Sequence, residues 1–143
     1  EKGLIMLDAD NFENVLGNLT ENAIKYSSAN KNITYSTSIS DKDATIRVLD
    51  SGIGIPKKHY KNIFKKFFRV EDALRAKTKG HGLGLSIVKN LVEMNGGKID
   101  VESEVGIGTT FILTFPLLIK DEPGLPNLSS KTKRATTDQQ EYA

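Results

Sequence analysis

Residues 10–27 read DNFENVLGNLTENAIKYS, and this stretch decides which fold the chain adopts. Apolar side chains recur along it at three- and four-residue intervals, the spacing of one face of an amphipathic helix. Asp10 stands where an N-cap residue is expected. Such a helix must bury its apolar face against a second layer of structure. The apolar positions are Phe12, Val15, Leu16, Leu19, Ala23 and Tyr26.

The rest of the chain predicts that this second layer is a β-sheet. Residues 32–39 and 44–49 alternate between apolar and polar, with turn-forming residues between them, so they predict an antiparallel hairpin. Further strands are expected around 99–101 and 111–115, a short helix over 60–68, and a long helix over about 82–95. We therefore predict an α+β fold, a two-layer α/β sandwich with helices on one face of a mixed, mostly antiparallel sheet.

The composition fits one globular domain and excludes several kinds of site. The 143 residues carry 20 Lys and Arg against 18 Asp and Glu, an excess too small to indicate nucleic acid or an anionic membrane as partner. Because the chain has no cysteine and only two histidines, disulfides, thiolate zinc sites, cysteine nucleophiles and histidine-rich metal sites are excluded. The chain is expected to be cytoplasmic.

The periodic pattern stops near residue 120, where Ser, Thr, Pro and charged residues take over. We expect one domain over 1–119 and a disordered C-terminal tail over 120–143. No apolar run approaches the roughly twenty residues that span a bilayer. The first residue is Glu1 rather than methionine, so we expect a fragment excised from a longer parent, which could carry a membrane anchor elsewhere.

A polar stripe runs beside the apolar face of the first helix. Asparagine is a poor helix former, so its repetition along this helix needs an explanation. One reason is that amide oxygens can enter a magnesium coordination shell while a nearby lysine contacts phosphate. The alternative is an ordinary solvated helix face. The stripe consists of Asn11, Asn14, Asn18, Asn22 and Lys25.

Two glycine-rich turns suggest contacts with a nucleotide. Asp50-Ser51-Gly52-Ile53-Gly54 follows a strand, so its carboxylate could accept a hydrogen bond from a nucleobase amino group; the alternative is a plain turn. Residues 79–85 read KGHGLGL and lead into a helix, whose N-terminus favours an anion; the alternative is a flexible hinge. Their spacing matches neither the P-loop nor the dinucleotide fingerprint.

The charge around the second turn favours a polyphosphate ligand. Residues 57–81 hold nine Lys or Arg against two acidic residues, a local charge of +7. His81 lies inside the glycine run, where it either donates to a phosphate or has no role, and His59 is expected to be an ordinary surface residue. Phe64, Phe67 and Phe68 are expected to lie in the core.

Taken together and in this order, these motifs resemble the catalytic, ATP-binding domain of sensor histidine kinases. That domain belongs to a superfamily with gyrase, a heat-shock chaperone ATPase and a mismatch-repair ATPase, and the likeness covers residues 5–116. It implies the Bergerat-type ATP-binding fold. The stretches similar to the family's N box, first glycine box, phenylalanine box, second glycine box and last glycine box are 18–27, 50–56, 63–69, 80–85 and 108–111.

The resemblance implies a role for each matching residue, with ATP and Mg²⁺ as the ligands. Asn22 would bind magnesium with Asn18 assisting, and Lys25 and Arg69 would contact phosphates. The adenine would meet Tyr26 and Asp50, in a pocket shaped by Gly52, Gly54 and Ile55, with Thr109 near the base. The phosphate-side lid and its hinge would comprise Gly80, His81, Gly82, Leu83, Gly84 and Leu85. Lys79 and His81 depart from the commonest pattern of the lid.

The resemblance also implies the reaction. Related ATPases activate water with a Glu four residues before the magnesium-binding Asn, but this chain has Asn18 there, so hydrolysis is disfavoured. The family transfers the γ-phosphoryl group to a histidine on a separate dimerisation and phosphoacceptor domain, and a response regulator acts downstream. Glu21 is the acidic residue placed to orient or deprotonate the acceptor imidazole.

Neither His59 nor His81 has the helical context of an acceptor histidine, so we expect a monomeric fragment whose acceptor domain is elsewhere. Two alternatives remain open. One is a regulatory module that binds nucleotide without phosphotransfer, and the other is an anti-sigma serine kinase of the same superfamily. The products distinguish them, because a serine kinase would form acid-stable phosphoserine.

Overall fold

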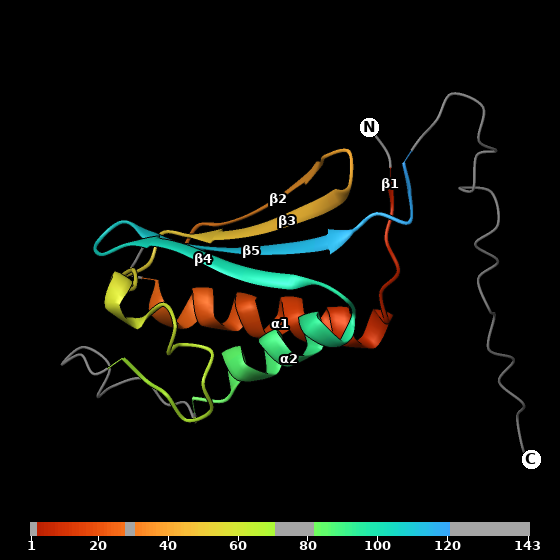
Figure 1. Cartoon of the computed structure of the whole chain (residues 1–143). Coiled ribbons are helices and arrows are strands. Elements are labelled where there is room, and N and C mark those ends of the chain that lie inside the picture. Colours follow the sequence, from red (N-terminus) through yellow and green to blue (C-terminus); the bar gives the residue numbers. More distant parts are fainter. Residues whose placement is uncertain (1–2, 28–30, 71–81, 121–143) are drawn as a thin grey trace, which may run out of the picture.

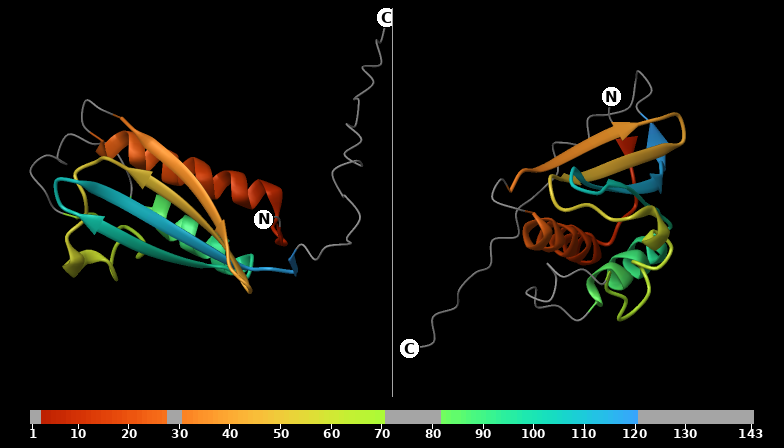
Figure 2. Two further views of the ribbon diagram at one scale, coloured as in Figure 1. Left: turned by 90° about the horizontal axis from the view of Figure 1, so that it is seen from above. Right: turned by 90° about the vertical axis from the view of Figure 1, so that its left-hand side faces the viewer.

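The computed structural model describes residues 3–27, 31–70 and 82–120 and has two layers. Two helices lie on one face of a four-stranded sheet with the strand order β2-β3-β5-β4 (Figure 1). The views in Figure 2 show both helices on the same side of this sheet. The predicted α+β sandwich is confirmed. The elements of these two layers are α1 (Ala9–Tyr26), β2 (Ile33–Ile39), β3 (Asp43–Asp50), α2 (Gly84–Met94), β4 (Lys98–Glu104) and β5 (Gly108–Pro116).

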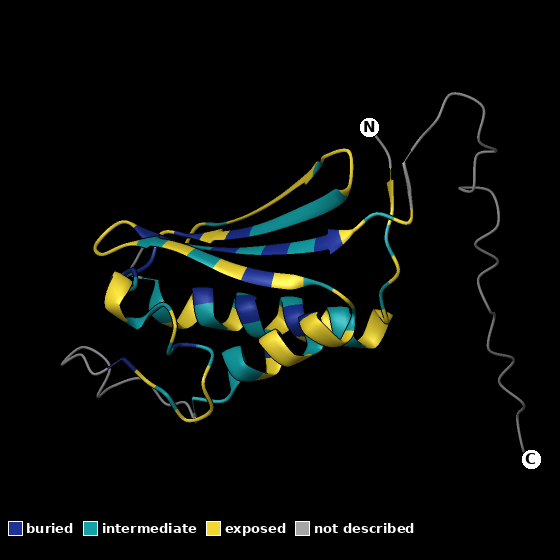
Figure 3. Cartoon of the chain, viewed as in Figure 1, coloured by how far each residue is buried: buried dark blue, intermediate teal, exposed yellow. Residues whose placement is uncertain are grey.

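The sheet is antiparallel in all of its pairs, so the expectation of a mixed sheet is wrong in that detail. Pairing of Val48 with Phe111, and of Phe111 with Val101, places one apolar set of side chains on the helix side of the sheet. Residues coloured as buried in Figure 3 lie on α1 and on the strands of the sheet, and they belong to one hydrophobic core. Leu113 and Phe115 are almost completely buried there.

Helix α1 forms because its apolar stripe meets this sheet, and Val15, Leu19 and Ala23 are buried against it. Its N-cap is Asp8, whose side chain accepts a hydrogen bond from the Asn11 backbone N–H at 2.8 Å. The prediction of Asp10 as N-cap is therefore wrong: Asp10 lies in the first turn, where its charge complements the helix dipole.

Helix α2 buries Val88 and Val92. Its C-cap is Asn95, and the next residue, Gly96, has the positive φ of 73° that suits glycine after a helix. No helix among the described residues is both long enough and apolar enough to cross a membrane.

Two short strands join the ends of the described chain. β1 (Gly3–Leu4) pairs antiparallel with β6 (Ile119–Lys120), as Figure 1 shows on the right. Both strands are only two residues long, which is too short for a periodic pattern to reveal them. Lys120 is thus still part of the paired structure, one residue beyond the predicted boundary, while the tail over 121–143 lies outside the described residues.

The segment from 57 to 70 is irregular, which corrects the short helix predicted there. Only Lys57–His59 forms a 3-10 helix, η1, and turns follow it. Phe64 and Phe68 pack partly against the core, as expected. Phe67 is instead 73% exposed and has a φ of 63°, so the expectation that it lies in the core is wrong. A φ in this range is uncommon for a residue other than glycine and is incompatible with a regular helix at Phe67.

Candidate functional site

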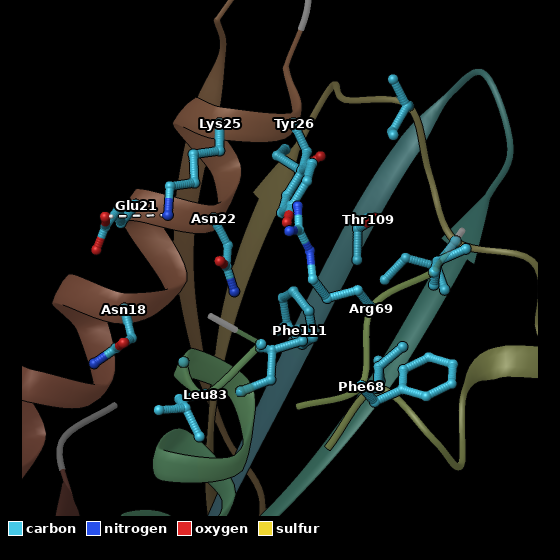
Figure 4. Close-up of a pocket in the computed structure, with 18 of the residues that line it drawn as sticks. Asn18, Glu21, Asn22, Lys25, Tyr26, Phe68, Arg69, Leu83, Thr109 and Phe111 are labelled. Atoms are coloured by element: carbon cyan, nitrogen blue, oxygen red, sulfur yellow. Dashed lines mark ion pairs between the residues drawn. The ribbon is translucent and has the colours of Figure 1, made fainter. Parts of the chain in front are cut away.

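A cavity of about 310 Å³ opens between the end of α1, the end of β3 and the start of α2. Figure 4 shows α1 along one side of it and Thr109 and Phe111 of the sheet behind. Its volume is in the range of small-ligand sites. Most of the predicted site residues line it: Asn18, Glu21, Asn22, Lys25, Tyr26, Asp50, Gly54, Ile55, Arg69, Gly82, Leu83, Gly84, Leu85 and Thr109.

One end of the cavity holds a buried carboxylate. Asp50 is the last residue of β3 and is only 7% exposed, and it pairs in register with Thr109 of β5. Its Oδ1 accepts a hydrogen bond from the Gly52 backbone N–H at 2.8 Å. Strand pairing therefore fixes both side chains at the same place on the sheet, where they offer hydrogen-bonding groups to a ligand.

Burial raises the pKa of Asp50 above its ordinary value near 3.8, while hydrogen bonds from the backbone N–H groups of Gly52 and Thr109 act in the opposite direction. Burying a carboxylate costs stability unless it is paired, and such groups are common at functional sites. A carboxylate held here is suited to accept a hydrogen bond from a ligand that donates one.

Glycines let the turn after β3 pack closely against its neighbours. A Cβ at Gly52 would lie 2.6 Å from the Tyr26 carbonyl oxygen, and the Ile53 N–H donates to that same oxygen at 3.0 Å. Gly54 has a φ of 74° and contacts the Glu104 backbone, which leaves no room for a side chain. Gly52 itself does not line the cavity; it shapes the wall by joining the turn to the end of α1.

The other end of the cavity collects amide oxygens and a cation from α1. The Asn18 side-chain N–H donates to the Asn14 carbonyl at 2.8 Å, which leaves its Oδ1 for other partners. A Cβ built on Gly84 would lie 3.2 Å from Asn18 Oδ1 and 4.0 Å from Asn22 Oδ1. Both amide oxygens therefore face the start of α2. These neutral oxygens, beside a free volume, are the kind of donor that Mg²⁺ accepts.

The polar stripe divides into two parts. Asn18, Asn22 and Lys25 line the cavity, whereas Asn11 and Asn14 do not. The ammonium group of Lys25 lies 3.4 Å from a carboxylate oxygen of Glu21, one turn earlier, as the dashed line in Figure 4 marks. The Glu21 side chain is well exposed, so the pair leaves its carboxylate open to solvent, and Glu21 also lines the cavity.

The third wall joins two distant segments. The Phe67 backbone N–H donates to the Gly82 carbonyl oxygen at 2.9 Å, and Gly82 has a φ of 68°. Arg69 reaches the cavity from the same irregular segment. Gly80 and His81, which were predicted to belong to the lid, lie outside the described residues.

Sequence reasoning missed six apolar residues of the lining. They come from the turn after β3, the segment over 57–70, α2 and β5. Phe68 also packs its ring 5.6 Å from that of His59, which is therefore less exposed than predicted. Apolar residues give no local signal that separates a cavity wall from a core. These additional lining residues are Ile53, Ile63, Phe68, Val70, Ile87 and Phe111.

Comparison with known proteins identifies a matching family model. Residues 7–119 match the model described as histidine kinase-, DNA gyrase B- and HSP90-like ATPase. This range includes all the residues described above that line the cavity.

A curated relative of the chain is named a sensor histidine kinase. The chain is 40% identical over 114 residues to the sensor histidine kinase WalK of Bacillus subtilis, which covers 78% of this chain and 19% of WalK. The chain thus spans about a fifth of the length of this relative.

Solved structures agree in fold. The mycobacterial sensor histidine kinase MprB has a TM-score of 0.67 at 27% identity, covering 79% of this chain and 74% of that one. Full-length ShkA in complex with AMPPNP has a TM-score of 0.68 at 27% identity, covering 85% of this chain and 25% of that one.

Proposed function

Because the chain belongs to the family of histidine kinase-, DNA gyrase B- and HSP90-like ATPases, as a catalytic domain of the sensor histidine kinase type, we propose that it transfers the γ-phosphoryl group of ATP to a histidine side chain. One observation carries the proposal: a single cavity has a buried carboxylate at one end and amide oxygens with a lysine at the other. This polarity suits a ligand with a neutral base and a charged triphosphate.

The base end selects and holds adenine. Asp50 accepts a hydrogen bond from the amino group of the base, while Thr109 lies beside it and Tyr26 and Ile55 supply the walls. Gly52 and Gly54 let the turn fold tightly around this end. The apolar residues of the lining exclude water, which strengthens the hydrogen bond to Asp50.

The phosphate end neutralises the triphosphate. Asn22 and Asn18 would hold Mg²⁺ through their side-chain oxygens, and the bound ion would offset the negative charge that develops on the phosphates. Lys25 of α1 and Arg69 of the segment over 57–70 both line the cavity and would contact phosphate oxygens. Gly82, Leu83, Gly84 and Leu85 present the start of α2, whose dipole also favours an anion.

Transfer needs an acceptor at the mouth of the cavity. A neutral imidazole nitrogen attacks the γ-phosphorus, the bond from phosphorus to the β–γ bridging oxygen breaks, and ADP leaves with the electron pair. Glu21 accepts the proton from the other imidazole nitrogen, and its ion pair with Lys25 holds the carboxylate in place. Positioning and charge neutralisation supply most of the rate enhancement in such phosphoryl transfers.

The acceptor is a histidine on a separate dimerisation and phosphoacceptor domain, and a response regulator receives the phosphoryl group afterwards. We place the reaction in the cytoplasm, where ATP is available. The chain by itself is monomeric in this proposal, because dimerisation is assigned to the separate phosphoacceptor domain. His59 lies in the short 3-10 helix η1 and packs against the ring of Phe68, which does not suit an acceptor role.

Phosphotransfer in trans tests the proposal. The chain is mixed with γ-labelled ATP, Mg²⁺ and a helical hairpin domain that carries the acceptor histidine of a sensor kinase, with a His→Gln hairpin as control. Acid-labile, base-stable label on the intact hairpin alone is the expected result. Label that survives acid would indicate serine, and nucleotide binding without any transferred label would leave only a regulatory role.

A further inference from the structure

Ser103 of β4 lies outside the cavity lining but contacts three groups around its base end. Its Oγ accepts a hydrogen bond from the Ile55 backbone N–H at 2.7 Å. The same atom lies 2.8 Å from the Gly108 carbonyl oxygen and 2.9 Å from Thr109 Oγ1. One hydroxyl therefore connects the turn after β3 with the start of β5, and both of these segments line the cavity.

Tyr60 holds Ser103 in place. β4 is an edge strand, so the backbone groups of Ser103 that face away from β5 have no strand partner. The Tyr60 hydroxyl donates to the Ser103 carbonyl oxygen at 2.6 Å and accepts from the Ser103 N–H at 2.8 Å. These two bonds to the Ser103 backbone hold its side chain in position.

The number of available protons decides the direction of each bond. A serine hydroxyl has one proton to donate and two lone pairs. A carbonyl oxygen cannot donate, so the Ser103 hydroxyl donates its proton to the Gly108 carbonyl oxygen. The remaining contact, between Ser103 and Thr109, must then use the proton of Thr109. Ser103 is fully used by one donated and two accepted bonds, and Thr109 Oγ1 can only accept further hydrogen bonds.

We propose that Ser103 is a specificity-determining positioning residue, which fixes the Thr109 hydroxyl as a hydrogen-bond acceptor toward the base. This inference rests on the proposed function. The Asp50 carboxylate and the Thr109 hydroxyl then both present hydrogen-bond acceptors at the base end. Adenine offers an amino group at C6, whereas guanine and hypoxanthine offer a carbonyl oxygen there. The site therefore favours ATP over nucleotides with a 6-keto base, whether Thr109 is reached directly or through a bridging water.

Removal of the Ser103 hydroxyl tests this assignment. In Ser103→Ala, the Thr109 proton is free to point into the cavity and to donate to a carbonyl oxygen. The ratio of the Kd of ITP to the Kd of ATP is expected to fall by about tenfold, the size of one net hydrogen bond. Ser103→Thr keeps the hydroxyl and is expected to retain the ratio. Ser36→Ala, at an exposed position of β2, is the matched control and is expected to leave it unchanged.

A double-mutant cycle with Thr109→Val separates this role from a structural one. If Ser103 acts through the Thr109 hydroxyl, Ser103→Ala is expected to change the ratio no further in the Thr109→Val background. Additive effects, or an unchanged ratio in folded Ser103→Ala, would overturn the inference alone. If Ser103→Ala does not fold, Ser103→Cys is measured in the same way. A folded wild-type chain that binds neither nucleotide would overturn the proposed function and the inference together.

Discussion

The Phe67 backbone N–H donates a hydrogen bond to the carbonyl oxygen of Gly82 at 2.9 Å, and this bond joins the irregular segment over 57–70 to the start of α2. Both residues have positive φ, 63° and 68°. The bond closes one wall of the cavity, because Phe68, Arg69 and Leu83 line it on either side of the contact. The shape of the phosphate end therefore depends on a backbone arrangement that most side chains resist.

Gly82→Ala is expected to weaken both folding and ATP binding. A Cβ there would lie 2.9 Å from the Phe67 carbonyl carbon, in addition to the strain of a positive φ. Gly96→Ala is the matched control, because Gly96 has a φ of 73° but nothing within 4 Å of its Cβ position. Gly96→Ala should cost about 1–2 kcal/mol of unfolding free energy in urea. Gly82→Ala should cost more and should lower ATP affinity; equal losses would show that the Phe67 contact is unimportant.

Asn22→Asp is expected to lower the affinity for ATP in the presence of Mg²⁺ by about tenfold, because an added negative charge repels the triphosphate. Asn14→Asp adds the same charge to the same helix but outside the cavity lining, and it should change the affinity little. Calorimetric titration with and without Mg²⁺ measures both. An Asn22→Asp chain that responds to Mg²⁺ as wild type does would remove Asn22 from the metal site.

Asp50→Asn is expected to change how stability depends on pH. Burial raises the pKa of Asp50 in the folded chain, so the folded state binds this proton more tightly than the unfolded state does. The contribution of Asp50 is thus fully present below pH 3.8 and is lost as pH rises through its folded pKa. Wild type should lose this stability as pH rises from 3.8 through the folded pKa of Asp50, whereas Asp50→Asn should not. The unfolding free energy of Asp50→Asn minus that of wild type should therefore increase with pH over that interval. A difference that stays constant from pH 3 to 7 would contradict it.

Phe67→Gly is expected to stabilise the folded chain. Phe67 is 73% exposed, so little packing is lost, and glycine removes a left-handed strain of about 1–2 kcal/mol, part of which is offset by its larger unfolded-state entropy. Phe64→Ala provides the contrast, because Phe64 packs edge-on against Phe111 with ring centroids 6.4 Å apart, and its loss should destabilise. Urea unfolding of the two variants measures whether each substitution raises or lowers the free energy of unfolding. Destabilisation by Phe67→Gly would mean that the Phe67 side chain makes a contact that matters.

Periodic patterns predicted the two layers because each element has one buried face. The stripe of α1 that contains Val15 and Leu19, and the alternation of Phe111 and Leu113, are direct consequences of that burial. The N-cap was misplaced by two residues because Asp8 and Asp10 are both good caps, and only the observed bond to Asn11 separates them.

The segment over 57–70 shows where pattern reasoning fails. Its apolar residues have helical spacing, yet several of them line the cavity wall, and the positive φ of Phe67 interrupts any helix. Within the site, Asp50 and Asn22 could be predicted as lining residues because each belongs to a short motif that is visible in the neighbouring sequence. The contacts of Ser103 with Tyr60 could not be predicted. These residues are 43 positions apart, and a hydrogen bond between them produces no pattern in the sequence around either residue.

Calorimetric titration of the chain with ATP and GTP, each with and without Mg²⁺, tests the central claim most directly, which is that one cavity binds adenine at Asp50 and the triphosphate at Asn18 and Asn22. The predicted result is saturable binding of one ATP per chain that is strengthened by Mg²⁺ and exceeds the binding of GTP, with the preference over GTP lost in Asp50→Asn. Absence of binding to a folded chain, or equal binding of ATP and GTP by wild type, would contradict this account.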